Sequence, residues 1–239
     1  MKDNRGITDE EGIAKRDFDE SKGGFWFYLS IVTFHFCMYV WLKVSIPNIP
    51  LLQHLSYLTI ICFFLNLIYY SWVLVLNSRY QSYFENYSGL NYFFRLIYSL
   101  SLVVMIMYWG MALFNPDAIY NARKSLMPIA LDLFLHGGNY FLNLFHYIFV
   151  YNKTNVRKFS NFLTIIIFLV TYSIWIRVLY LTVDIIVYPF AAKSLITFLT
   201  VITFGSFFAL FADFTFYLLA NGVRAKIRSM VKLIINIGN

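Results

Sequence analysis

The chain contains 239 residues, of which 60% are hydrophobic, 21% aromatic and only 13% charged. Because a soluble domain carries about twice that share of charged residues, the composition excludes a soluble globular protein and predicts an integral membrane protein. The net charge of +7 does not indicate a nucleic-acid partner, because the basic residues lie between apolar runs and at both ends of the chain, as in proteins that face anionic lipid.

Apolar runs of about 20 residues, long enough to cross the hydrocarbon core, recur along the chain and predict an all-α, polytopic transmembrane helix bundle. Residues 1–24 are polar and of mixed charge, and we expect a flexible tail there. The bundle is predicted at residues 25–221 and a basic amphipathic tail on the membrane surface at 222–239. Residues 183–190 are too short to span and are expected at the interface. Six spans are predicted, at residues 25–44, 55–76, 93–114, 126–151, 162–181 and 195–219.

The distribution of Lys and Arg sets the expected orientation. With six spans, 13 of these residues fall on the side of the two termini and 4 on the other side. Positive charge is concentrated in cytosolic loops, so both termini are expected in the cytosol, in a multi-pass protein of the endoplasmic reticulum or plasma membrane. Two glycosylation sequons, at Asn86 and Asn152, fall in loops assigned to the cytosol, and we interpret them as chance matches in an Asn-rich chain.

The fourth apolar run differs from the others because polar residues and glycines lie in its middle. They are Asp132, His136, Gly137, Gly138 and Asn139. An ionisable group in hydrocarbon is costly unless it faces a partner or a wet cavity, so it is a candidate for a functional site. Asp132 precedes His136 by four residues and shares its side of the helix. His146, ten residues beyond His136, would lie about 80° away from that side in a regular helix, so we do not group the two histidines.

Depth along the helices, at 1.5 Å per residue, brings four polar groups together. Thr59 in the second span is expected roughly 6 Å inside the non-cytosolic face, and His136 roughly 12–15 Å inside it. Asp132 lies one turn nearer that face than His136, and Arg177 of the fifth span lies within roughly 6–8 Å of it. We therefore expect one buried, partly hydrated pocket whose walls are open to lipid.

Each of these residues also has a purely structural explanation. A Thr in a membrane helix commonly bonds to the carbonyl four residues earlier, and a His in a bundle often makes an interhelical hydrogen bond. Asp132 and Arg177 are able to pair as a clamp, and Gly137-Gly138 to let another helix approach closely. In the catalytic interpretation, His136 accepts the proton of a Thr hydroxyl that attacks an ester carbonyl, and Asp132 orients the imidazole.

Four short segments carry a family resemblance through their order and spacing. They are Tyr57-Leu58-Thr59 with Asn66, then Asn115-Pro116-Asp117-Ala118-Ile119-Tyr120, Leu135-His136-Gly137, and Trp175 followed by Val187-Tyr188-Pro189-Phe190. Together they resemble the androgen-induced-gene membrane proteins and their relative, the androgen-dependent regulator of tissue factor pathway inhibitor. The resemblance covers residues 51–219, most of the chain.

The resemblance implies a multi-span hydrolase of fatty acid esters of hydroxy fatty acids that needs no metal or organic cofactor. The Thr nucleophile and His base of that family, carried over, fall on Thr59 and His136, and a family amide residue falls on Asn66. This chain has Leu135 where the family has an Asn, and Asn139 where it has a second His. These departures put the substrate range in doubt.

The sequence therefore predicts an acyl transfer within the bilayer, with Thr59 as nucleophile and His136 as base. Arg177 or Asn139 is expected to hold the substrate carboxylate or the oxyanion. The expected partners are membrane lipids and the ester, with no nucleic acid and no obligate protein partner. The alternative is a lipid-binding or transport protein that uses the same polar pocket without chemistry. Cys37 and Cys62 lie within apolar runs and lack metal-ligand spacing, so no metal site is predicted.

Overall fold

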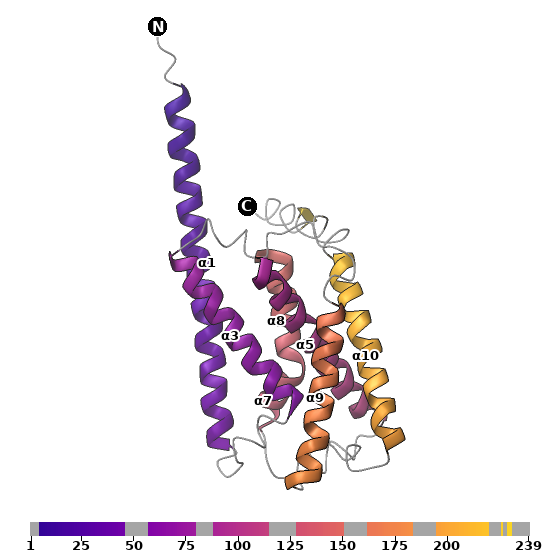
Figure 1. The fold of residues 1–239 in the computed structure, drawn as a ribbon. Coiled ribbons are helices and arrows are strands. Elements are labelled where there is room, and N and C mark those ends of the chain that lie inside the picture. The colour runs from indigo at the N-terminus through magenta and orange to yellow at the C-terminus, as the bar shows by residue number, and fades with distance from the viewer. Residues whose placement is uncertain are drawn as a thin grey trace.

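The computed structural model describes residues 5–45, 57–79, 88–114, 128–150, 162–183, 195–219, 226 and 229–230, with the backbone alone for 5–23, 77–79, 88, 111, 149–150, 195, 197–198 and 201–202. Helices make up the elements of these segments, as the all-α class predicts. The long ones are α1 (Arg5–Ser45), α3 (Leu58–Arg79), α5 (Ser88–Phe114), α9 (Phe162–Val183) and α10 (Leu195–Leu218). They stand side by side with the helical segment at 129–150, and the start of α1 and the end of α10 lie at the same end of the bundle (Figure 1).

Four helical stretches in the described part of the chain are long and apolar enough to cross a membrane. They are Gly24–Ser45, Leu58–Leu76, Gly89–Phe114 and Phe162–Val183, and Thr203–Leu218 is a shorter apolar helix. Their outer faces carry large hydrophobic side chains, including Leu113 at 78% and Phe114 at 91% exposure, which suits contact with lipid rather than water. The protein is therefore an integral membrane protein, and the predicted spans correspond to its helices.

The fourth span is helical from Ile129 to Val150 but is not one regular α-helix. Two α-helical pieces, α7 (Ile129–Leu133) and α8 (Asn139–Phe145), alternate with two π-helical ones, η1 (Phe134–Gly138) and η2 (His146–Val150). Every fourth side chain is buried along this segment, at Leu131, Leu135, Asn139, Asn143 and Tyr147. In an α-helix four such steps rotate the side chain by about 160°. The π turns hold more residues per turn, and this keeps the series facing the bundle.

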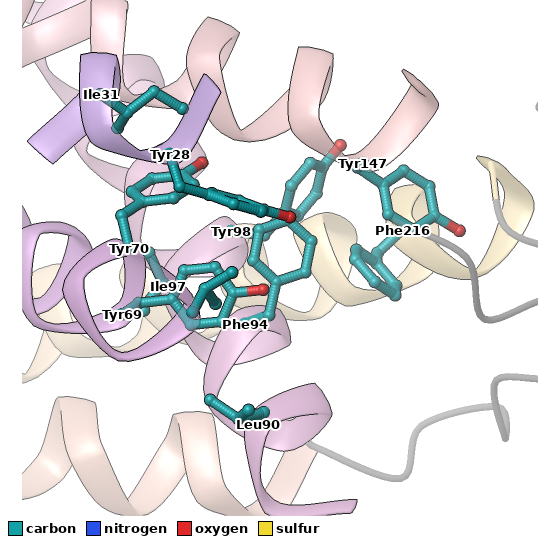
Figure 2. Packing of buried hydrophobic residues seen from close by; sticks show 11 residues of the cluster. Tyr28, Ile31, Tyr69, Tyr70, Leu90, Phe94, Ile97, Tyr98, Tyr147 and Phe216 are labelled. Carbon is teal, nitrogen blue, oxygen red and sulfur yellow. The ribbon is translucent and has the colours of Figure 1, made fainter. Parts of the chain in front are cut away.

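The helices associate largely through aromatic packing. α5 is the central helix and contacts α3, α9, α10, η1 and α8, whereas α1 packs on α3 and α7. In one core cluster, Tyr28, Tyr70, Tyr98, Tyr147 and Phe216 bring rings from five different helical segments together (Figure 2). Association in lipid depends on close packing rather than on a hydrophobic driving force, and these broad side chains supply it.

A buried ion pair lies in the same part of the bundle. Arg95 of α5 donates to the carboxylate of Asp213 on α10, and the two residues are 3% and 0% exposed. The Arg95 guanidinium also lies 5.3 Å from the centre of the Phe216 ring. An Arg within a membrane span needs a partner, and Asp213 supplies it across the helix pair α5 and α10.

Several expectations fall outside the described residues. They concern the interfacial segment beyond residue 183, the sequons, the motifs at 115–120 and 187–190, and most of residues 222–239. The side of the membrane that each end faces, and the division into tail, bundle and basic tail, stay predictions. α1 itself begins at Arg5, within the segment that we predicted to be the N-terminal tail.

Candidate active site

His136 lies in η1 and contacts the residue one turn earlier on its own helix. Its Nδ1 lies 2.9 Å from the backbone carbonyl oxygen of Asp132 and 3.0 Å from the carboxylate Oδ1. Both oxygens are acceptors, so in the neutral ring Nδ1 carries the proton and Nε2 keeps its lone pair. This is the tautomer that a general base needs, and the four-residue spacing seen in the sequence produces it.

Tyr108 of α5 joins this pair from the neighbouring helix. Its hydroxyl donates to Asp132 Oδ2 over 2.6 Å, and its ring stacks on the His136 imidazole with centroids 3.8 Å apart and planes 17° from parallel. Asp132 and Tyr108 are only 5% and 6% exposed, whereas the His136 side chain is 18% exposed. His136 is thus the accessible member of a buried group of three. Within the described residues, no hydrogen-bond partner faces its Nε2.

The two glycines after His136 have different roles in packing. A Cβ on Gly138 would lie 2.3 Å from Cδ2 of Phe134, whose ring packs edge-on against Phe34 of α1 at 4.8 Å. A Cβ on Gly137 would make only an ordinary contact, 3.6 Å from Nε1 of Trp109. Gly138 therefore makes room for a ring of its own helix, and that ring fastens η1 to α1.

An apolar groove of about 710 Å³ lies between α5 and the fourth span, beside the site. Its lining is Met105, Ile106, Trp109, Gly110, Leu113, Leu133, Gly137, Gly138 and Phe141. Leu113, Leu133 and Phe141 are also exposed on the outer surface, so the groove opens toward lipid. Two of these lining residues are chain neighbours of the site: Trp109 follows Tyr108, and Gly137 follows His136. The wall of the groove that they form therefore lies next to Tyr108, Asp132 and His136.

Thr59 lies in the first turn of α3 and is half-buried. Its neighbours Ile60 and Phe63 pack in one core cluster with Leu131 and Leu135 of the fourth span. This packing brings the start of α3 and the His136 segment into the same layer of the bundle. The described contacts include no hydrogen bond between the Thr59 hydroxyl and His136.

Arg177 lies on α9, in the part of that helix that packs beside the start of α3. The residue before it, Ile176, belongs to a cluster that Leu58 and Ile61 of α3 cover. The Arg177 guanidinium lies 5.4 Å from the centre of the Tyr180 ring, one turn along its own helix. Arg177 is half-buried and lies at the level of the first turn of α3, which holds Thr59, on a different helix from His136.

Asn66 and Asn139 are placed deeper in the core. The Asn66 amide donates to the Cys62 carbonyl over 2.8 Å and to Ser101 over 3.4 Å. The Asn139 amide oxygen lies 3.2 Å from Nε2 of His35 on α1. In the described part of the chain neither amide is hydrogen-bonded to His136.

Sequence reasoning missed Tyr108, which is one of 19 tyrosines and has no motif around it. The depth of Tyr108 along its helix could have identified it. Tyr108 lies in the last two turns of α5, and Asp132 lies near the start of α7, so both sit close to the same end of the bundle. Counting depth for tyrosines as well as for charged residues would have put Tyr108 beside Asp132.

These features define a class: a polytopic α-helical membrane protein whose core holds a histidine between a carboxylate and an aromatic ring. The chain belongs to the FAR-17a/AIG1-like protein family, whose sequence profile matches residues 24–224. This confirms the resemblance to the androgen-induced-gene proteins. No curated protein and no solved structure matches the chain significantly.

Proposed function

We propose that the protein is an intramembrane lipid hydrolase that cleaves fatty acid esters of hydroxy fatty acids, with Thr59 as nucleophile and His136 as general base. The observation that carries the proposal is the state of His136. Its Nδ1 is held on Asp132 at 3.0 Å, which leaves the lone pair on Nε2, and its side chain is 18% exposed. Membership of the FAR-17a/AIG1-like family and the resemblance at Thr59 support the same assignment.

The reaction has two acyl-transfer steps. The Thr59 hydroxyl oxygen attacks the ester carbonyl while His136 Nε2 takes the hydroxyl proton. The tetrahedral oxyanion collapses, the ester C–O bond breaks, and His136 returns the proton to the leaving hydroxy fatty acid. Water then attacks the acyl-Thr ester, again giving its proton to His136, which passes it to the Thr59 oxygen as the free fatty acid leaves. Asp132 remains a carboxylate and stabilises the imidazolium in both steps.

Substrate access is proposed to be lateral, from the bilayer. The groove beside Gly137 is lined by apolar side chains and opens toward lipid, which suits an acyl chain. Arg177 of α9, which packs beside the start of α3 where Thr59 lies, has the charge needed to hold a substrate carboxylate. Thr59 and His136 approach each other in the substrate complex, as catalytic hydrogen bonds commonly tighten only there.

A second function has one observation in its favour. A lipid-binding or transport protein would use the same lipid-facing groove, and it would need no proton transfer at His136. A fluorophosphonate probe distinguishes the two functions, because it labels an activated hydroxyl and leaves a passive site unmodified.

Ester hydrolysis by the detergent-purified protein is the test. We expect wild type to cleave branched fatty acid esters, and Thr59→Ala and His136→Ala to lose activity and probe labelling with only a small change in melting temperature. Thr203→Ala is the matched control, because the Thr203 hydroxyl donates to the Leu199 carbonyl of its own helix and is exposed. If wild type cleaves no ester and takes up no probe, the binding or transport function replaces the hydrolase.

A further inference from the structure

We infer that Tyr108 is a positioning residue for the base His136, acting through the Asp132 carboxylate and through the face of its own ring. The inference rests on the proposed function, because the position of His136 affects a rate only if His136 takes a proton. Tyr108 makes two separate contacts in the site, a 2.6 Å hydrogen bond to Asp132 and a 3.8 Å stack on His136.

The hydroxyl determines the orientation of the carboxylate. Asp132 faces His136 with Oδ1 and Tyr108 with Oδ2, so the hydrogen bond from Tyr108 fixes the rotation of the carboxylate plane. That rotation keeps Oδ1 directed at Nδ1. When His136 takes a proton, the contact between Nδ1 and Oδ1 becomes a charge-assisted hydrogen bond and strengthens. The hydroxyl is therefore expected to act on the chemical step more than on substrate binding.

The ring determines the orientation of the imidazole. Two rings 3.8 Å apart and 17° from parallel leave the imidazole little freedom to turn about its bond to Cβ. Asp132 holds one edge of the imidazole through Nδ1, and Tyr108 covers one face. Together the two contacts define the direction in which Nε2 points. Because Tyr108 belongs to α5 and His136 to η1, the packing of these two helices sets that direction.

Two substitutions separate the two contacts. Tyr108→Phe keeps the ring and removes the hydroxyl, and Tyr108→Leu removes both. We expect kcat for ester hydrolysis to fall about tenfold in Tyr108→Phe, the effect of losing one hydrogen bond to a charged group, and about a hundredfold in Tyr108→Leu. KM is expected to stay within about twofold of wild type in Tyr108→Phe, because the hydroxyl does not contact substrate.

Tyr70→Phe is the matched control. The Tyr70 hydroxyl is also buried and donates to a side-chain oxygen, Asn143 Oδ1, over 2.7 Å. Both Phe variants should therefore lower the melting temperature by a similar amount, whereas only Tyr108→Phe should lower kcat. Equal losses of kcat in the two variants, or an unchanged kcat in Tyr108→Phe, would show that Tyr108 only supports the packing.

A double variant tests the route through Asp132. If the Tyr108 hydroxyl acts by orienting that carboxylate, adding Tyr108→Phe to Asp132→Asn should produce no further fall in kcat. A further tenfold fall would overturn the inference. The outcome for wild type separates the two proposals. An active wild type with an insensitive Tyr108→Phe contradicts only the role of Tyr108, and a wild type that cleaves no ester contradicts the hydrolase function together with this inference.

Discussion

His136 and His146 lie on the same membrane helix, and their surroundings are opposite in kind. His136 has a carboxylate at Nδ1, a stacked tyrosine and an 18% exposed side chain. His146 is fully buried, and its Nε2 lies 3.0 Å from the uncharged hydroxyl of Tyr28. The rings of Phe27, Tyr28, Tyr69, Tyr70 and Phe94 surround it, with the nearest centroid at 4.9 Å.

The difference shows what separates a candidate base from a structural histidine. Both side chains face the bundle and both have a tyrosine partner, so burial and an aromatic neighbour do not distinguish them. The two histidines differ in that His136 has an acidic partner and a partly exposed side chain. A carboxylate stabilises the imidazolium that forms when a base takes a proton, and access lets the substrate reach the lone pair. Only His136 combines the two in the described structure.

Replacing each histidine by Ala should separate activity from stability most strongly. His136→Ala is expected to lower kcat/KM at least about a thousandfold, because the base is lost, with a small change in melting temperature. His146→Ala leaves a cavity among aromatic rings and should reduce the free energy of unfolding by about 2–4 kcal/mol while the folded fraction stays active. Hydrolysis assays corrected for folded protein, together with melting curves, measure both. The comparison fails if His146→Ala also abolishes activity in folded protein.

Asp132→Asn should have the next largest effect on the reaction. An Asn amide is able to present its NH2 group to Nδ1, which favours the tautomer with the proton on Nε2 and disables the base. We expect kcat to fall at least about a hundredfold with little change in KM. Asn143→Asp, which places a carboxylate on the same helix near His146, is the reciprocal change and should not create a second active histidine. If Asn143→Asp restored activity to the Asp132→Asn protein, then the buried His146 would be able to act as base, and exposure of the histidine to substrate would not be required.

Gly138→Ala should produce a moderate loss of stability. The added Cβ would lie 2.3 Å from the Phe134 ring, so the ring has to move from its place against Phe34. Overpacking of this kind costs about 1–3 kcal/mol in the free energy of unfolding. Gly137→Ala is the matched control, because its Cβ would make an ordinary contact and should cost less than about 1 kcal/mol. Urea titrations of the two variants in detergent, compared with wild type, check the ranking.

Tyr28→Phe should produce the smallest effect. It removes the hydrogen bond to His146 but keeps the ring, so the free energy of unfolding should fall by about 1 kcal/mol. Hydrolysis should be unchanged, because His146 lies outside the proposed site. A fall in kcat comparable to that expected for Tyr108→Phe would mean that the two histidines are coupled, and it would be detected in the same assay.

The sequence predicted the parts of this molecule that depend on local pattern. The positions of the spans follow from runs of apolar residues, and the contact between Asp132 and His136 follows from a spacing of four on one helix. The placement of Thr59 near the His136 layer came from depth. Its role as nucleophile came from the catalytic interpretation of that cluster together with the family resemblance, and it stays a prediction.

The contacts that the sequence did not predict join helices that are distant along the chain. Tyr108 meets Asp132, His35 meets Asn139, and Arg95 meets Asp213 across different helix pairs. Depth alone leaves the rotation of each helix undetermined, so many polar residues at similar depth remain possible partners. The π turns were a further obstacle, because a projection at 100° per residue assumes the regular helix that residues 134–138 do not form.

The π turns also bear on how this helix tolerates insertions and deletions during evolution. A π turn is equivalent to an α turn with one additional residue, so η1 and η2 behave as two single-residue insertions absorbed within a membrane span. Removing one residue from Phe134–Gly138 would replace the π turn by an α turn and leave the residues that follow facing nearly the same way. Removing one residue from the α-helical stretch Asn139–Leu142 would instead rotate the residues that follow by about 100°. Asn143 would then turn away from Tyr70, although the span would lose only about 1.5 Å of length. Deletions outside the π turns are therefore constrained by the angular register of the buried polar residues far more than by the thickness of the membrane.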